Sequence, residues 1–207
     1  MAKRKLPLIV ERNLSEVHVA RIGVEQGLKQ KVLRDGSVSC KVGCSNCCLH
    51  PRHISPFEGF LLYRGLVERG RWTPQLKIRV AEHAKLTTQL ALPVWFLSSI
   101  PCPVLDLATG KCMAYESRPM ACRLSLSREP SDECHPHRFD RNFPFPQVDV
   151  REEMDAYLAV ERRIHHAQGI KITLVTLSNS LLLASRVDSG EIDFDRINFE
   201  LFLLSQG

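Results

Sequence analysis

The sequence lacks any apolar run long enough to cross a membrane. Its longest candidate, residues 170–184, is interrupted by Lys171 and Asn179 and is shorter than the roughly 20 apolar residues that a transmembrane helix needs. The first residues are basic, but only five apolar or proline residues, 6–10, follow before Glu11. The apolar region of a secretory signal has roughly 7–15 residues. These absences predict a cytoplasmic protein without a membrane partner.

Features typical of nucleotide and nucleic-acid binding are scarce as well. The sequence has no glycine-rich nucleotide-binding loop, no internal repeat and no low-complexity segment. Aromatic residues make up 7% of the chain, and the formal net charge is +5. The Lys and Arg residues are scattered among acids and form no basic stripe interleaved with aromatics. The sequence therefore gives no support for binding to nucleic acid.

Cysteine, in contrast, is abundant. The eight cysteines form two groups, Cys40, Cys44, Cys47 and Cys48 in the first and Cys102, Cys112, Cys122 and Cys134 in the second. A disulfide scaffold is one interpretation of eight cysteines. Structural disulfides are rare in a reducing cytoplasm, however, and clustered thiols there are more often ligands. We therefore predict that all eight cysteines bind a metal.

The first group has the spacing of a chelating loop. Cys44 and Cys47 form a Cys-x2-Cys pair, whose two-residue gap lets the backbone wrap around a metal with both thiolates pointing inward. With Cys40 the spacing also matches that of radical S-adenosylmethionine enzymes, but here the motif follows a predicted helix and lacks the βα repetition of a partial barrel. Cys48 directly follows Cys47, and adjacent side chains diverge. We expect Cys48 to serve a second metal or a different atom of a cluster.

The second group is spread out, with separations of 10, 10 and 12 residues. Such gaps suit successive loops that each bring one thiolate to a common site. Four plus four cysteines permit two tetrahedral sites, and equally one cluster with spare thiols, so the pairing stays open. The histidines that flank the two groups are further candidate ligands or simply polar imidazoles, namely His50, His53, His135 and His137. The others lie on predicted helices away from cysteines and are not expected to bind, namely His18, His83, His165 and His166.

Helices are predicted on both sides of the cysteines. Apolar residues recur at three- and four-residue spacing, and capping signals mark the ends, such as Ser55-Pro56 at a start and Asp35-Gly36 at a stop. The predicted helices cover residues 13–34, 55–70, 73–92, 149–169 and 170–184, the last with a strand as its alternative. Residues 101–134 are rich in turn residues, and we expect two short strands there around a turn at 106–110.

These elements predict a mainly α fold, in which helices surround an irregular cysteine-rich metal-binding centre with at most a short β-hairpin. A proline-rich link at 143–146 divides the chain into two parts. Residues 1–142 are expected to form the cysteine-cluster metal-binding domain with its N-terminal helix. Residues 143–207 are expected to form a helical region that packs on it, including an apolar end at 194–204.

A compound motif runs through both cysteine groups. It consists of Cys40-x3-Cys44-x2-Cys47-Cys48, then Cys102-Pro103-x-Leu105, Gly110-x-Cys112 and Tyr115-Glu116-x-Arg118-Pro119-x2-Cys122-Arg123. This order of residues resembles the YkgJ-type cysteine-cluster proteins, which carry the CxxCxxCC zinc- or iron-chelating domain. The resemblance covers about residues 40–134 and implies metal binding by the eight cysteines. Some relatives are described as iron–sulfur oxidoreductases, and flagellin lysine N-methylases carry a similar domain within a longer chain.

Two arginines of the motif, Arg118 and Arg123, are predicted to bind the cofactor. Thiolate clusters are anionic, and a nearby guanidinium would stabilise them or anchor an anionic substrate. The alternative is a helix-end arginine paired with Glu116 or Asp132. Tyr115 is expected mainly to pack, with a hydrogen bond to a cysteine sulfur as its second role.

Three functions follow from the sequence. The first is a metal-binding protein that holds zinc, iron or an iron–sulfur cluster, with redox activity left open. The second is an enzyme that modifies a protein side chain, as the methylase resemblance implies. The third is a zinc-stapled interaction module that binds a protein partner without catalysis.

Overall fold

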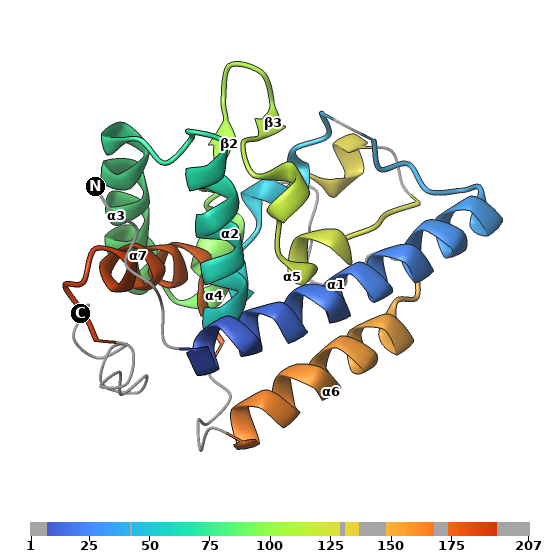
Figure 1. The fold of residues 1–207 in the computed structure, drawn as a ribbon. Coiled ribbons are helices and arrows are strands. Elements are labelled where there is room, and N and C mark those ends of the chain that lie inside the picture. Colours follow the sequence, from blue (N-terminus) through green and yellow to red (C-terminus); the bar gives the residue numbers. More distant parts are fainter. Residues whose placement is uncertain (1–7, 42, 129–130, 137–147, 168–173, 194–207) are drawn as a thin grey trace.

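The computed structural model describes residues 8–41, 43–128, 131–136, 148–167 and 174–193, and it is mainly α-helical in these ranges (Figure 1). The helices of at least one α-helical turn are α1 (Leu8–Asp35), α2 (Pro56–Glu68), α3 (Pro74–Thr88), α4 (Leu92–Leu97), α5 (Met120–Arg123), α6 (Arg151–Ala167) and α7 (Leu177–Asp188). The 3-10 helices are η1 (Asn46–Leu49), η2 (Tyr115–Ser117) and η3 (Ser131–Cys134). The strands are β1 (His53–Ile54), β2 (Leu105–Asp106), β3 (Lys111–Cys112) and β4 (Val175–Thr176). The predicted mainly α fold is confirmed.

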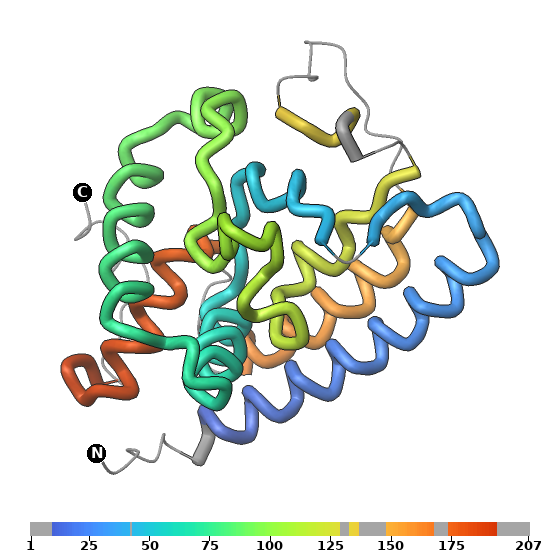
Figure 2. Tube along the Cα trace, turned by 90° about the horizontal axis from the view of Figure 1, so that it is seen from above, coloured from blue at the N-terminus to red at the C-terminus, as the bar shows by residue number. Residues whose placement is uncertain are grey.

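Helices α1 and α6 lie side by side and run in opposite directions (Figures 1 and 2). Ion pairs join their opposite ends, because Lys31 Nζ lies 3.1 Å from Glu153 and Arg163 Nη2 lies 3.0 Å from Glu16. The predicted helix over residues 13–34 is confirmed, although it begins five residues earlier, at Leu8. The glycine that follows Asp35 has a positive φ of 61°, a conformation that ends many helices.

Helix α2 lies at the centre of the fold and packs on α1 and α7. The predicted capping box starts it, since the Ser55 side chain accepts a hydrogen bond from Glu58 N at 3.2 Å and Pro56 occupies the first turn. Phe57, Phe60 and other apolar residues of α2 are buried in the main core. The same logic starts α3, whose cap Thr73 accepts from the Leu76 backbone N–H.

The contact between α2 and α7 depends on a glycine. A Cβ at Gly59 would meet the side chain of Ser180 and approach its carbonyl carbon to 2.9 Å. We expect Gly59→Ala to lower the free energy of unfolding by about 1–3 kcal/mol, the usual cost of overpacking. Gly23→Ala is the control, because it lies in α1 with no atom within 4 Å of the added Cβ. It should raise stability by about 0.5–1 kcal/mol, and urea denaturation of both variants would measure the two opposite signs.

Two short antiparallel sheets complete the described fold. Strands β2 and β3 pair as the predicted hairpin, with Leu105 opposite Cys112. Strands β1 and β4 pair His53 with Thr176, and this second sheet was not predicted. Its strand β4 and helix α7 share the predicted 170–184 segment, so both sequence interpretations hold for parts of it.

The two described helices that follow residue 148 pack on different earlier helices. Helix α6 packs on α1, and α7 packs on α2 and α3. The proposed link at 143–146 and the apolar end at 194–204 lie outside the described residues. The division of the chain at residues 142 and 143 therefore stays a prediction. No helix in the described ranges combines the length and apolar character that spanning a membrane requires.

Candidate metal centre

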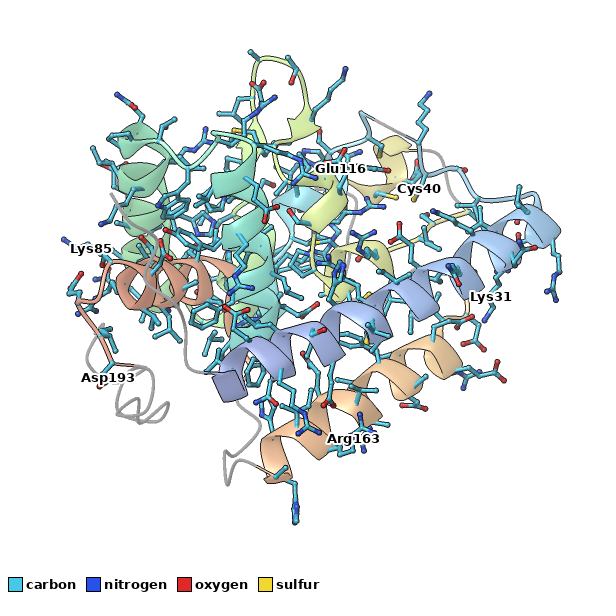
Figure 3. The ribbon with its side chains drawn as sticks, viewed as in Figure 1. Lys31, Cys40, Lys85, Glu116, Arg163 and Asp193 are labelled. Atoms are coloured by element: carbon cyan, nitrogen blue, oxygen red, sulfur yellow. The ribbon has the colours of Figure 1, made fainter. Side chains whose placement is uncertain are left out.

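Three irregular segments bring the cysteines together. The first carries Cys40 to Cys48, the second carries Cys102 to Cys122, and the third carries Cys134. Figure 2 shows residues 43–54 and 101–128 adjacent to each other beside the helices, and Figure 3 draws the side chains, with Cys40 and Glu116 labelled. Backbone hydrogen bonds join the segments. The Cys102 amide donates to Cys48 O at 2.7 Å, and the Ser39 amide donates to Ser127 O at 2.9 Å. The two cysteine groups, separate in the sequence, therefore form one region.

Arg52 holds the first cysteine loop against α5. Its guanidinium donates to Cys47 O at 2.8 Å, to Ala121 O at 3.3 Å and to Ser125 Oγ at 2.9 Å. These bonds cross the boundary between the two cysteine groups. Sequence reasoning missed Arg52, because the residue lies outside the compound motif and its partners Ala121 and Ser125 are 69 and 73 positions away.

The cysteines line two adjoining cavities. The first has a volume of about 640 Å³ and is bordered by Cys44, Cys47, Cys48, Cys102, Cys112 and Cys122. The second has a volume of about 190 Å³ and is bordered by Cys40, Cys44, Cys47, Cys122 and Cys134. All eight predicted ligands, which all lie in the described ranges, thus border one cavity or the other, and none of them is in a disulfide. The donor set fits a soft metal such as zinc or iron.

The thiols, all in the described part of the chain, line the two cavities, but their sulfur atoms do not converge on one position that a metal ion could occupy. Within the described ranges, no group of three or more His, Cys, Asp or Glu side chains is arranged so that it would hold a metal ion as it stands. Zinc binds thiolate sulfur at about 2.3 Å. Binding of a metal would therefore draw the cysteine-bearing segments inward around the cavities.

Burial makes most of these thiols resist ionisation. It raises the pKa of Cys102, Cys112 and Cys122, because a buried thiolate loses its hydration. Cys47 differs. The hydrogen bond from the Cys48 thiol, with the charges of Arg52 and Arg118 nearby, lowers the pKa of Cys47 to about 6. A metal ion would have to displace protons from the other thiols as it binds.

The candidate histidines are not equivalent. His50 borders the second cavity, and its Nε2 lies 3.0 Å from Cys134 O. His53 lies on β1 with its ring 5.6 Å from that of Trp95, and it borders neither cysteine-lined cavity. His135 directly follows Cys134 in the described chain, and His137 lies outside the described residues. Among the three of these histidines that the structure describes, His50 is the one found in the lining of a cavity that the cysteines share.

The histidines expected to be non-ligands lie on helices. His18 is on α1, and its Nδ1 lies 3.1 Å from Arg21. His83 is buried on α3 with its Nδ1 2.8 Å from Ser178 Oγ. His165 is buried on α6 against the Phe57 ring. None of these three borders either of the two large cavities, although His83 shares a small cavity of about 10 Å³ with Cys102 and His50.

Arg118 and Arg123 occupy different surroundings. Arg118 borders both cavities, and its guanidinium lies 4.1 Å from the centroid of the Tyr115 ring. Its charge helps to lower the pKa of Cys47. Arg123 also borders the second cavity, but its side chain is bonded elsewhere, to Glu25 Oε1 at 2.7 Å and to Arg118 O at 2.9 Å. A cofactor role for the two residues stays a prediction, and the geometry favours it more for Arg118.

A buried carboxyl group anchors the beginning of α5. Glu58 Oε1 accepts a hydrogen bond of 2.6 Å from Met120 N, two residues before Cys122. On α6, Glu161 accepts from Tyr157 at 2.9 Å and from the Ser55 hydroxyl. Sequence reasoning missed this network, since the capping box alone accounted for Glu58. It links the helical core to the second cysteine group.

The stability of this network should depend on pH. Burial and the neighbouring Glu161 carboxyl raise the pKa of Glu58 from 4.5 to about 7, so the native state binds this proton more tightly than the unfolded chain does. Stability contributed by the protonated carboxyl is therefore complete below about pH 4.5 and is lost as the pH rises to about 7. Glu58→Gln removes this loss and keeps the acceptor for Met120 N.

Relative to the wild type, Glu58→Gln should gain on the order of 3 kcal/mol between pH 4.5 and 7, at about 1.36 kcal/mol per pKa unit. Urea unfolding across this pH range measures the difference, in which the contributions of groups that do not interact with Glu58 cancel. Glu68→Gln, at an exposed position of the same helix, is the control and should follow the wild type. A constant difference for Glu58→Gln would contradict the raised pKa.

Comparison with known proteins agrees with the cysteine pattern. Residues 39–138 match the family model CxxCxxCC, described as "Putative zinc- or iron-chelating domain". The matched segment contains all eight cysteines, and it begins and ends close to the resemblance expected from the compound motif. No curated protein and no solved structure gives a significant match to the chain.

Proposed function

We propose that this protein is a metal-binding protein whose eight cysteine thiolates hold zinc or iron. The observation that carries the proposal is the position of the thiols, because three separate segments place all eight on the walls of two adjoining cavities. The match of residues 39–138 to a zinc- or iron-chelating domain supports the same assignment. Free thiols persist as ligands in a reducing compartment, so we place the protein in the cytoplasm.

The physical need for a metal lies in the irregular segments. Thiols that are buried and close together repel one another when ionised, and a bound cation removes this repulsion. Structural zinc contributes on the order of 10–16 kcal/mol of apparent binding free energy in small domains. A metal would therefore hold residues 40–50 and 101–134 together where regular secondary structure is short.

An iron–sulfur cluster with redox activity is the second candidate. Arg118 and Arg52 favour it, since both lie close enough to lower the pKa of Cys47 and would stabilise an anionic thiolate cluster. The Arg118 Nε atom is buried and has no hydrogen-bond partner in the described part of the chain. It is thus available to a cluster sulfur or an anionic ligand. The protein-modifying and interaction-module functions gain no comparable observation.

Elemental analysis of protein purified without oxygen, with an absorption spectrum, tests the proposal. Zinc or iron should be present, and Cys44→Ser should contain less of it. The control His166→Gln, which removes a possible ligand from an exposed position of α6, should keep the wild-type metal content. Iron with matching acid-labile sulfide and absorption near 400 nm would identify a cluster, whereas zinc alone is colourless. Protein that contains neither metal and takes up neither on reconstitution would overturn the proposal.

A further inference from the structure

The order of the cysteines along the chain does not match their order around the cavities. Cys48 belongs to the first sequence group but borders only the first cavity, together with Cys102 and Cys112. Cys134 belongs to the second sequence group but borders only the second cavity, together with Cys40. Cys48 therefore lies with cysteines of the second sequence group, and Cys134 lies with cysteines of the first.

Backbone contacts build the first set of thiols. The Cys102 amide donates to Cys48 O at 2.7 Å, which ties the two residues together. The β2–β3 hairpin then brings Cys112 opposite Leu105, whose amide bonds to Cys102 O at 3.0 Å. Burial raises the pKa of Cys102, and the neighbouring thiols of Cys122 and Cys112 raise it further. All four cysteines border the first cavity, although Cys48 and Cys122 are 74 positions apart in the sequence.

A different set of contacts builds the second set. The Ser127 amide donates to Cys40 Sγ at 3.2 Å, and η3 packs against η1, so that His50 reaches Cys134 O. Burial raises the pKa of Cys40, and the thiols of Cys44, Cys47 and Cys134 raise it further. Judged by the exposed fraction of the whole residue, Cys134 is the most deeply buried of the eight cysteines.

The helix η1 explains how adjacent residues serve different sides. A 3-10 helix has 3.0 residues per turn, so consecutive side chains point about 120° apart. Cys47 and Cys48 both lie in η1. Cys48 borders only the first cavity, whereas Cys47 borders both. The adjacent pair is thus placed at the boundary between the cavities, with Arg52 and Arg118 lining both.

We propose that the protein holds two metal centres whose ligands cross the order of the chain. One is formed by Cys48, Cys102, Cys112 and Cys122, and the other by Cys40, Cys44, Cys47 and Cys134. The inference rests on the proposed function and adds to it the number of centres and their ligands. Each centre offers four thiolates to one tetrahedral ion such as zinc. The thiol protons are released to solvent as the metal binds.

Zinc titration of the reduced, metal-free protein tests the assignment, with bound zinc counted after competition with a chelator. The wild type should retain two ions. Two double variants, each lacking two cysteines, separate crossed from sequential pairing. Cys40→Ser with Cys134→Ser removes two ligands from one crossed centre and should keep one ion. Cys40→Ser with Cys48→Ser removes one ligand from each centre and should keep neither.

The opposite result for the two variants would establish sequential pairing and overturn the inference. A second matched pair covers the case in which one variant fails to fold, as judged by circular dichroism. Cys48→Ser with Cys102→Ser should keep one ion, and Cys102→Ser with Cys134→Ser should keep none. A wild type that retains a single ion would overturn the two-centre arrangement and leave the metal-binding function intact. A wild type that retains none would overturn both.

Discussion

Removal of the metal is expected to lower the free energy of unfolding by at least about 4 kcal/mol, the stabilisation that a ligand gives at 1,000 times its dissociation constant. For a chain of this size, about 2–4 °C of melting temperature correspond to 1 kcal/mol. The midpoint should therefore fall by roughly 8–16 °C. The reason is that the proposed metal would bind thiols that come together in the folded protein, so its binding free energy would add to the stability.

The loss should be concentrated in the cysteine-bearing segments. Helices α2 and α7 bury their own apolar faces and should keep their protection from hydrogen exchange. Residues 43–50 and 101–128 should exchange faster after chelation, because β2, β3 and α5 are short and their segments lie on the cavity walls. Added zinc should restore protection and magnesium, which prefers oxygen ligands, should not. Unchanged melting and exchange in protein verified to be metal-free would contradict a structural role for the metal.

Arg123→Ala should destabilise the protein by about 3 kcal/mol. The Arg123 side chain is 4% exposed, with Nη1 2.7 Å from Glu25 and Nε donating to Arg118 O at 2.9 Å. It also donates to Glu116 O. Its removal leaves two backbone carbonyls without this donor and leaves Glu25, whose side chain is 33% exposed, with Lys29 at 3.9 Å as its ion-pair partner. A hydrogen bond to a charged group contributes about 1.5–3 kcal/mol, and solvent replaces part of each lost bond at these half-exposed acceptors, so three lost bonds give about 3 kcal/mol. Urea denaturation of the wild type and the variant, both at the same metal concentration, measures the effect.

Arg118→Ala is the matched control, since it removes the same side chain five residues earlier. Arg118 stacks on Tyr115, a contact worth about 0.5–1 kcal/mol at an exposed site, so the stability loss should be small. Metal content should instead fall more in Arg118→Ala than in Arg123→Ala, because Arg118 is the arginine whose charge acts on Cys47. Equal stability losses in the two variants would show that the bonds of Arg123 to Glu25 on α1 and to the carbonyls of Glu116 and Arg118 add nothing to the free energy of unfolding.

The long helices could be predicted because their signals are local, whereas α4 and α5 were not predicted. The helix expected over residues 73–92 ends at Thr88, and Pro93, expected to stop it, lies in the first turn of α4. Ser55 and Thr73 each cap a helix through a backbone N–H three residues ahead, and a pattern of that length is readable in the sequence. The β2–β3 hairpin is similarly local, closed by Gly110 with a φ of 65°. The cysteines themselves were identified by their clustering and by the compound motif.

What the sequence left open depends on contacts between distant residues. Glu58 bonds Met120 N across 62 positions, and Arg52 bonds Ser125 across 73. Nothing in either local sequence specifies the partner, because a carboxylate or guanidinium serves equally well at the surface. The distribution of Cys48 and Cys134 between cavities has the same origin. It follows from how η1, η3 and the hairpin pack, and the spacing of the cysteines does not encode it.

The pairing of β1 with β4 has a consequence for the time at which the fold is completed. His53, five residues after Cys48, pairs with Thr176, so its partner strand is synthesised more than 120 residues later. At about 5–20 residues per second, a ribosome needs roughly 6–24 s to cover that distance. Cys134, the last of the eight cysteines, precedes Thr176 by 42 residues, so we expect all eight to be open together to metal donors and oxidants for roughly 2–8 s of that time. The order of synthesis thus provides a period for loading before the last strand closes behind the first cysteine loop.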